Sequence, residues 1–125
     1  MGIDRIYPDG IAKANFQKRK NELIEKAGQL LVEIVVSSIS GEAVGYCLST
    51  INERGIGELD SIFLEESFRG KGIGREFVRR ALEWMDGVGV QAKKVNVLEV
   101  NQEAVGLYRE FGFRTRQLEM VIPKS

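Results

Sequence analysis

The chain has 125 residues, of which 18 are basic and 18 acidic, so its formal net charge is zero and no nucleic-acid partner is expected. It has no histidine and one cysteine, Cys47, which excludes histidine-dependent catalysis, histidine-ligated metals and an internal disulfide. Its length predicts one domain, 1–125, and the lack of a long apolar run or a signal-peptide pattern predicts a cytoplasmic protein without a membrane partner.

The first half of the chain predicts one helix followed by three strands. Residues 11–27 have a helical pattern that Gly28 ends, and short turns at residues 40–42 and 52–55 separate the runs of strand-forming residues that follow. Consecutive strands joined by such short turns are antiparallel neighbours. The predicted strands cover residues 30–39, 43–51 and 58–64.

The second half alternates helices and strands. An amphipathic helix comes first and ends near residues 87–89. Residues 94–100 form the next strand, which is parallel to strand 58–64 because a helix connects the two. Asn101 can cap another helix, which ends at Gly112. The alternating apolar residues of a last predicted strand are Leu118, Met120 and Ile122.

A glycine-rich loop between strand 58–64 and the helix after it predicts an anion site. The first N–H groups of a helix lack internal partners and lie at the positive end of its dipole, and glycines let a phosphate approach the backbone closely. Neither a Walker loop nor a dinucleotide fingerprint fits, because Arg75 and Glu76 follow the last glycine. We therefore expect a pyrophosphate to bind at Gly70, Gly72 and Gly74, with Arg69, Lys71 and Arg75 around it.

Three segments, in the right order, resemble the motifs of the GNAT superfamily of acetyl-CoA-dependent N-acetyltransferases. Residues 69–74, which read Arg-Gly-Lys-Gly-Ile-Gly, match the family's motif A throughout. Residues 101–113 look like motif B, with Asn, Ala, Tyr, Gly and Phe at the family's spacing, and residues 41–46 resemble the hairpin that enters the third strand. The resemblance covers roughly residues 30–123 and leaves residues 1–28 as an atypical, shortened N-terminal part.

The resemblance implies an α/β fold of the GNAT type, with a mixed, mostly antiparallel central sheet, flanking helices and a parallel strand pair that splays at its C-terminal ends. In this family the pantetheine arm of acetyl-CoA enters the wedge between the splayed strands and pairs with main-chain groups of the central strand. The implied cofactor-binding residues are Ile62, Phe63, Leu64, Arg69, Gly70, Lys71, Gly72, Ile73, Gly74, Arg75, Asn101 and Tyr108.

The resemblance also implies direct transfer of the acetyl group to an amine in a ternary complex. The alkylammonium must first lose a proton, and Glu58 and Asp60, about 7 Å apart on one side of the central strand, are the candidate bases, acting directly or through water. The backbone N–H of Leu64 is the candidate donor to the oxyanion. Tyr108 stands where the family's general acid stands and would protonate the departing thiolate.

Each assignment has a plainer alternative. The loop can be a tight turn without a ligand, Tyr108 a core tyrosine, and Glu58 and Asp60 solvent-facing strand residues. Cys47 is interpreted as an inert buried thiol rather than an acyl-carrying nucleophile.

The N-terminal part leaves the acceptor open. Family members usually begin with a strand and two helices that wall off the acceptor site, whereas only one helix is predicted here before residue 30. A missing first strand would expose the edge of strand 30–39, which favours a homodimer. The main hypothesis is an enzyme acting on an amine-bearing small molecule, peptide or protein. The alternatives are a non-catalytic acetyl-CoA-binding sensor, a subunit of a larger acetyltransferase assembly, or transfer of a longer acyl group.

Overall fold

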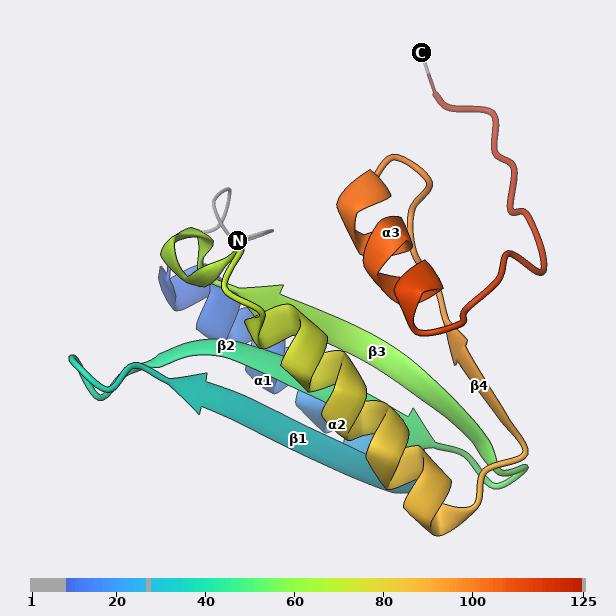
Figure 1. The fold of residues 1–125 in the computed structure, drawn as a ribbon, viewed down its shortest axis with the longest axis horizontal. Helices are drawn as coiled ribbons and strands as arrows, with labels where there is room; N and C mark the ends of the chain where they lie inside the picture. The colour runs from blue at the N-terminus through green and yellow to red at the C-terminus, as the bar shows by residue number, and fades with distance from the viewer. Residues whose placement is uncertain (1–8, 27, 125) are drawn as a thin grey trace.

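The computed structural model describes residues 9–26 and 28–124, which form a four-stranded sheet with a helix on each face (Figure 1). Helix α1 (Asp9–Lys26) covers one face and helix α2 (Ile73–Val88) covers the other, while helix α3 (Gln102–Glu110) lies beyond the end of the last strand. The strands, in sheet order, are β1 (Gln29–Val36), β2 (Ala43–Ile51), β3 (Ile56–Leu64) and β4 (Ala92–Val95), and a short 3-10 turn, η2 (Glu66–Phe68), follows β3.

The strand directions confirm the predicted mixed sheet. β1 pairs with β2 and β2 with β3 in antiparallel fashion, whereas β3 and β4, which α2 connects, are parallel. The first helix is present where the sequence predicts it. Ala27, its expected last residue, and residues 1–8 lie outside the described part of the chain.

Helix α2 packs one apolar side against the sheet. On the strands, Cys47 and Leu59 belong to the same core cluster. Gly57 allows the close approach, because a Cβ there would lie 2.6 Å from the sulfur of Met85. Gly89 ends the helix with a φ of 87°, and its N–H donates to carbonyl groups of the last turn. The buried residues of α2 are Phe77, Val78, Ala81 and Met85.

A β-bulge in β3 lies at the point where this strand parts from β4. Leu59 and Ser61 pair with neighbouring residues of β2, so Asp60 is an extra residue in the ladder. The parallel pairing ends at the same point, where Leu59 lies opposite Val95. β3 continues to Leu64 while the chain after Val95 leaves the sheet. The two strands therefore splay, as the resemblance implied.

Two strand predictions near the C-terminus need correction. The predicted strand 94–100 is the shorter β4, because β3 turns away at the bulge and leaves the backbone after Val95 without a strand to pair with. The predicted last strand is wrong: residues 113–124 run as an unpaired chain away from α3 (Figure 1). The sheet edge that such a strand would use is only as long as β4. The side chains of Leu118, Met120 and Ile122 are exposed.

The opposite edge of the sheet is β1, where the sequence predicts an exposed strand. Ile34 and Val36 on this strand are about half exposed. In the part of the chain that the structure describes, none of the helices combines the length and apolar character needed to span a membrane.

Candidate active site

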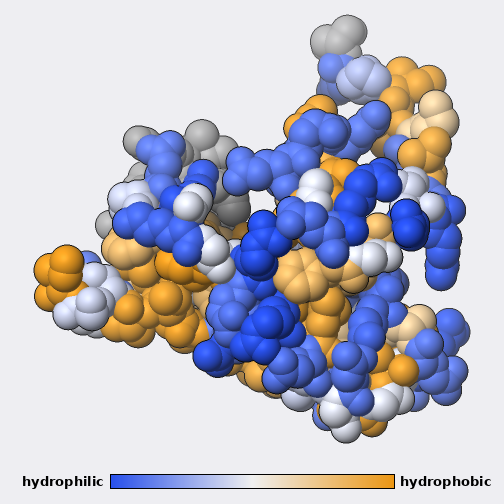
Figure 2. Space-filling model, in the orientation of Figure 1, coloured by the Kyte–Doolittle hydropathy of each residue, from blue (hydrophilic) through white to orange (hydrophobic). Residues whose placement is uncertain are grey.

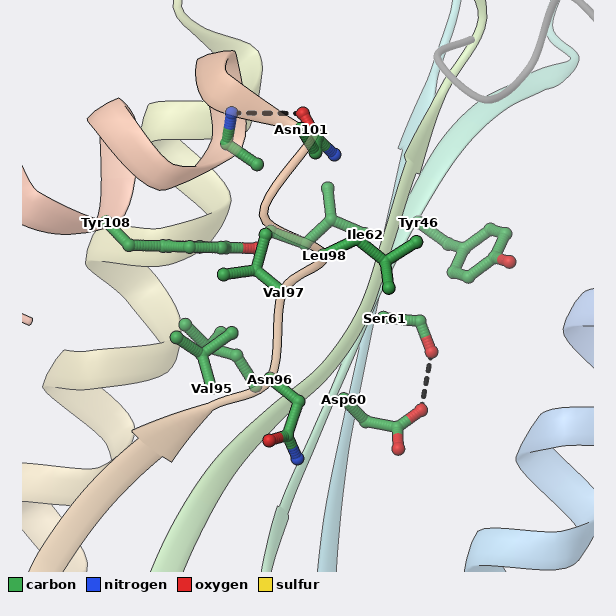
Figure 3. A pocket seen from close by; sticks show the side chains of 12 residues that line it. Tyr46, Asp60, Ser61, Ile62, Val95, Asn96, Val97, Leu98, Asn101 and Tyr108 are labelled. Carbon is green, nitrogen blue, oxygen red and sulfur yellow. Dashed lines mark hydrogen bonds between the residues drawn. The ribbon is translucent and has the colours of Figure 1, made fainter. Parts of the chain in front are cut away.

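A hollow of about 290 Å³ opens where β3 and β4 separate (Figure 3). Its walls come from the middle of β3, from residues 95–98 and from α3, with Tyr46 of β2 at one side. Ligands of sheets with parallel strands bind at such splits, beyond the carboxyl ends of the strands. Four of the predicted site residues line this hollow: Asp60, Ile62, Asn101 and Tyr108.

The glycine loop leads into α2 with open space in front of it. Gly70 and Gly72 have φ values of 74° and 85°, in the left-handed region that favours glycine, and no side chain caps the helix that begins at Ile73. A Cβ built at Gly70, Gly72 or Gly74 would meet nothing within 4 Å. A second hollow of about 490 Å³, between β1 and the start of α2, is walled in part by residues 71–73. The described side chains therefore leave the loop accessible to an anion.

The Arg69 side chain bends back over the end of β3. Its Nε donates to the carbonyl oxygen of Leu64 at 2.9 Å. Burial lowers the pKa of the Arg69 guanidinium to about 10, against the opposing effect of Glu103, so the group stays protonated at neutral pH. Arg69 thus fixes the loop to the strand that the resemblance implies for the pantetheine arm.

The other two basic residues of the loop differ in how they are engaged. Arg75 pairs across to α3, with its Nη1 2.6 Å from the Oε1 of Glu110. Lys71 is exposed, and its Nζ lies 5.6 Å from the centre of the Phe68 ring. A phosphate would have to compete with Glu110 for Arg75, whereas the ammonium of Lys71 lies at the surface.

Helix α3 supplies Asn101 and Tyr108. The Asn101 Oδ1 accepts a hydrogen bond from the backbone N–H of Ala104 at 3.2 Å, which confirms the predicted cap. Tyr108 extends from α3 toward the wedge (Figure 3), and its ring meets Phe113 edge-on. Burial, with a smaller effect of Cys47, raises the pKa of the Tyr108 hydroxyl, so it keeps its proton at neutral pH. That is the state in which a general acid starts.

Asp60 is held by a residue of α1. It accepts two hydrogen bonds from Arg19, at 2.6 and 3.0 Å, and a third from the Ser61 hydroxyl. Burial alone would raise the pKa of Asp60, but the bonds from Arg19 and Ser61 outweigh it and hold that pKa below its ordinary value. A carboxylate bound in this way is a weak proton acceptor.

Glu58 lies on the same face of β3 and is less constrained. Its Oε2 accepts a hydrogen bond from the Asn96 side chain at 3.1 Å, and its Oε1 is 3.8 Å from the Lys94 ammonium. The side chain is 28% exposed, compared with 9% for Asp60. Of the two carboxylates, Glu58 is therefore the more accessible to solvent, although it lies outside the lining of the hollow.

Cys47 does not reach the site as a nucleophile. It is buried, and burial raises the pKa of its thiol to about 12, in keeping with an inert core residue. Among the described residues, no group of three or more cysteines and carboxylates could hold a metal ion.

Sequence reasoning missed Arg19 and the bulge. Arg19 lies in a charged stretch of α1, where the sequence gives no sign of a partner, and only the fold brings it to a residue 41 positions away. The bulge did leave a signal: Asp60 and Ser61 are adjacent polar residues that interrupt the alternation between Leu59 and Ile62. Such a break in period is what an extra residue in a strand produces.

Comparison with known proteins identifies the family. The model of the acetyltransferase (GNAT) family matches residues 4–113, and the chain belongs to this family. It is 28% identical over 89 residues to an uncharacterised N-acetyltransferase of Methanocaldococcus jannaschii, covering 66% of this chain and 39% of that protein. It is 38% identical over 74 residues to the peptidyl-lysine N-acetyltransferase YjaB of Salmonella typhimurium, covering 58% and 43%.

The fold agrees with that assignment. The aminoglycoside N-acetyltransferase AAC(6')-Iy, solved in complex with CoA, superimposes with a TM-score of 0.69 at 18% identity, covering 98% of this chain and 96% of that one. In sequence, the chain spans about two fifths of the length of the two curated relatives, 39% and 43%.

Proposed function

We propose that this chain is an acetyl-CoA-dependent N-acetyltransferase that transfers the acetyl group directly to an amine in a ternary complex. The observation that carries the proposal is the open glycine loop at the uncapped start of α2, next to a wedge that Tyr108 lines. Family membership supports it, and so does the CoA complex of a structural neighbour.

Binding would divide between the loop and the wedge. The amides at the start of α2 and the ammonium of Lys71 would hold the diphosphate of acetyl-CoA, with Gly70, Gly72 and Gly74 keeping the approach clear. The backbone of residues 62–64, past the point where β4 stops pairing, would hold the pantetheine arm. The Asn101 amide would support the arm from α3. Acetyl-CoA itself supplies an activated thioester.

We assign the base to Glu58, directly or through water, and a positioning role to Asp60. Asp60 is already bound to Arg19, while Glu58 is accessible on the same face. The backbone N–H of Leu64 is the proposed donor to the oxygen on which negative charge develops. Tyr108, still protonated at neutral pH, would give its proton to the departing thiolate.

The acceptor would be an amine on a small molecule, a peptide or a protein. The accessible Glu58 carboxylate on the α1 face of β3 favours a cationic acceptor before deprotonation. A relative named as a peptidyl-lysine N-acetyltransferase makes a lysine side chain the first amine to try. We also propose that residues 1–125 act as one cytoplasmic domain and that the chain forms a homodimer.

Calorimetry with acetyl-CoA and the full chain tests the first half of the proposal. We expect one site per chain, and a Lys71→Ala variant should bind more weakly. An absence of any heat of binding would count decisively against the loop as a cofactor site.

A pH–rate profile tests the assignment of the base. Glu58→Gln should lower kcat by on the order of 10²-fold and remove the acid limb of the profile. Asp60→Asn should keep that limb. If the acid limb moves in Asp60→Asn and not in Glu58→Gln, the two roles are reversed, and if it moves in neither, bulk water is the base.

A second candidate is an acetyl-CoA-binding sensor or a subunit of a larger acetyltransferase assembly. One helix before β1 is the observation that favours it, because the acceptor wall then rests on α1 alone within the described residues. A thiol-release assay across amines, lysine peptides and aminoglycosides separates the two, since a sensor binds acetyl-CoA without turnover.

A further inference from the structure

Lys94 places a primary amine beside the carboxylate that we assign as the base. Its Nζ lies 3.8 Å from the Oε1 of Glu58, and the two residues pair directly across the parallel strands β3 and β4. The Lys94 side chain is 53% exposed, so water surrounds much of it. An exposed ion pair of this kind contributes little to stability, and the ammonium is free to move away from Glu58.

This ion pair lies directly next to the hollow between the two strands. The next residues along the strands, Leu59 and Val95, line the hollow and form the last pair before the strands separate. Successive residues of a strand are about 3.3 Å apart, a distance that the flexible four-carbon stem of a lysine covers. Asn96, which lines the hollow (Figure 3), donates a hydrogen bond to the other oxygen of Glu58. Glu58 thus connects the Lys94 ammonium to the wall of the hollow.

The neighbouring lysine, Lys93, has none of these features. It lies on the opposite face of β4, because successive side chains of a strand alternate, and its Nζ is 2.5 Å from the Oδ1 of Asp86 on α2. Figure 2 shows this α2 side of the molecule, where hydrophilic residues gather over the helix. Lys93 is therefore a matched lysine that faces away from the proposed base.

We propose that Lys94 is itself an acceptor, so that the protein acetylates its own chain at this side chain when acetyl-CoA is bound. The inference rests on the proposed function, because it takes Glu58 as the base and the wedge as the place of the thioester. Lys94 meets the requirements for an acceptor. It is a primary alkyl amine, it has a carboxylate within reach of one water, and it lies next to the hollow.

The reaction joins the Lys94 nitrogen to the acetyl carbon and breaks the bond between that carbon and sulfur. Glu58 takes a proton from the ammonium, directly or through water, and the neutral amine attacks the thioester. The departing thiolate takes a proton from Tyr108, which a second proton from the nitrogen restores through water. Overall, an ammonium and a thioester become an amide, a free thiol and one proton released to water. Acetylation removes the charge of Lys94, so Glu58 loses its ion pair and becomes available to an external ammonium.

Mass spectrometry of the full chain, incubated with saturating acetyl-CoA and no other amine, is the first test. We expect each chain to gain the mass of one acetyl group, located at Lys94 by peptide mapping. The rate should not change on dilution of the protein, because the amine and the site belong to one molecule, and Glu58→Gln should lower it on the order of 10²-fold. Lys94→Arg should stay unmodified, whereas the matched control Lys93→Arg should be modified like the natural chain.

Three results of this experiment would overturn the proposal. The first is a Lys94 that stays unmodified, or that is labelled no more than the other exposed lysines of the chain. The second is a rate that rises with protein concentration, because one molecule would then modify another. The third is an equal rate in the Glu58→Gln variant.

Lysine footprinting with free CoA gives a readout that needs no transfer. A small amine-modifying reagent is applied with and without CoA, which carries no acetyl group, and the labelling of each lysine is compared. CoA should slow the labelling of Lys94 severalfold and leave that of Lys93 unchanged. Lys71, which is expected to contact the diphosphate, should also be protected. Lack of protection at Lys94 overturns the proposal, and the labelling of Lys71 shows whether the cofactor site fails with it.

A thiol-release assay with a lysine peptide, run in parallel, separates this inference from the proposed enzyme. If the peptide is acetylated with turnover while Lys94 stays unmodified, the enzyme stands and self-acetylation is wrong. If neither the peptide nor Lys94 is acetylated, both proposals are wrong.

Discussion

Arg19 and Asp60 join α1 to the bulge of β3 through a bidentate, partly buried ion pair. The pKa of Asp60 lies below its ordinary value, so the pair stabilises the fold above the unfolded-state pKa and loses that effect as the pH falls through the folded-state pKa. We expect Asp60→Asn to lower the free energy of unfolding by about 1–3 kcal/mol at pH 7. The deficit relative to the natural chain should shrink from about pH 4 downward.

Urea unfolding at pH 7 and at successively lower pH measures this deficit. Glu22→Gln is the control, because Glu22 also approaches Arg19, at 3.9 Å, but from the exposed surface. Its effect should stay within about 0.5 kcal/mol. A deficit for Asp60→Asn that is equally large at every pH would assign the loss to packing rather than to the ion pair.

Tyr108 is the second residue whose environment predicts a measurable role. Tyr108→Phe keeps the ring contact with Phe113 and removes only the proton donor. We expect kcat to fall by on the order of 10²-fold while the Kd for acetyl-CoA stays nearly constant. Tyr46→Phe is a matched control, since the Tyr46 side chain points from the pocket wall toward α1 (Figure 3). Equal kcat values for the two variants would show that Tyr108 is a packing residue and not the general acid.

Among the elements, the contact between β2 and β3 depends on Gly45. A Cβ at this position would lie 2.8 Å from the backbone oxygen of Phe63 and 2.6 Å from the Leu64 side chain. Gly45→Ala should therefore cost about 1–3 kcal/mol of unfolding free energy. Gly87→Ala, in the exposed part of α2 with nothing within 4 Å, should be neutral or stabilising by up to about 1 kcal/mol. Denaturant unfolding measures the free energy of unfolding of both variants. A larger loss for Gly87→Ala than for Gly45→Ala would contradict the prediction.

A negative charge at the junction of the glycine loop and α2 should lower the affinity for acetyl-CoA. Gly72→Glu would place a carboxylate in front of the helix start, and we expect acetyl-CoA to bind at least about tenfold more weakly. Gly41→Glu adds the same charge at a similar φ, 74°, in the turn between β1 and β2. It controls for backbone strain and should leave the affinity unchanged. Calorimetry measures the affinity of both variants for acetyl-CoA. An equal loss of affinity in the two would contradict the placement of the diphosphate at this loop.

At the scale of the whole molecule, local pattern predicted most of the fold. The β-branched runs, the glycine turns and the apolar side of α2 predicted the strand order and its directions, and Asn101 predicted the start of α3. The two strand predictions that failed concern segments without a neighbouring strand. Residues 96–100 and 118–122 have strand composition, but a strand needs a neighbouring strand to pair with. Residues 96–100 have none because β3 parts from β4 at the bulge. Residues 118–122 have none because the chain after α3 does not run along the sheet.

The candidate site was predictable to the same extent. Contiguous motifs predicted where the loop glycines and Tyr108 lie, at the open start of α2 and at the wedge, and their roles stay predictions. The difference between Glu58 and Asp60 was not predictable, because Arg19 reaches Asp60 from a helix far away in the sequence. Tertiary contacts of this kind, rather than residue type, distinguish two acidic residues on one strand.

The bulge at Asp60 makes the capacity to hold a ligand depend on a single inserted residue. Without this extra residue, β3 and β4 could stay hydrogen-bonded to their ends, and the hollow between the two strands would close. The insertion also supplies the carboxylate that fastens α1 over the gap it creates. The opening of the sheet and the anchoring of the helix beside it therefore depend on the same residue, Asp60.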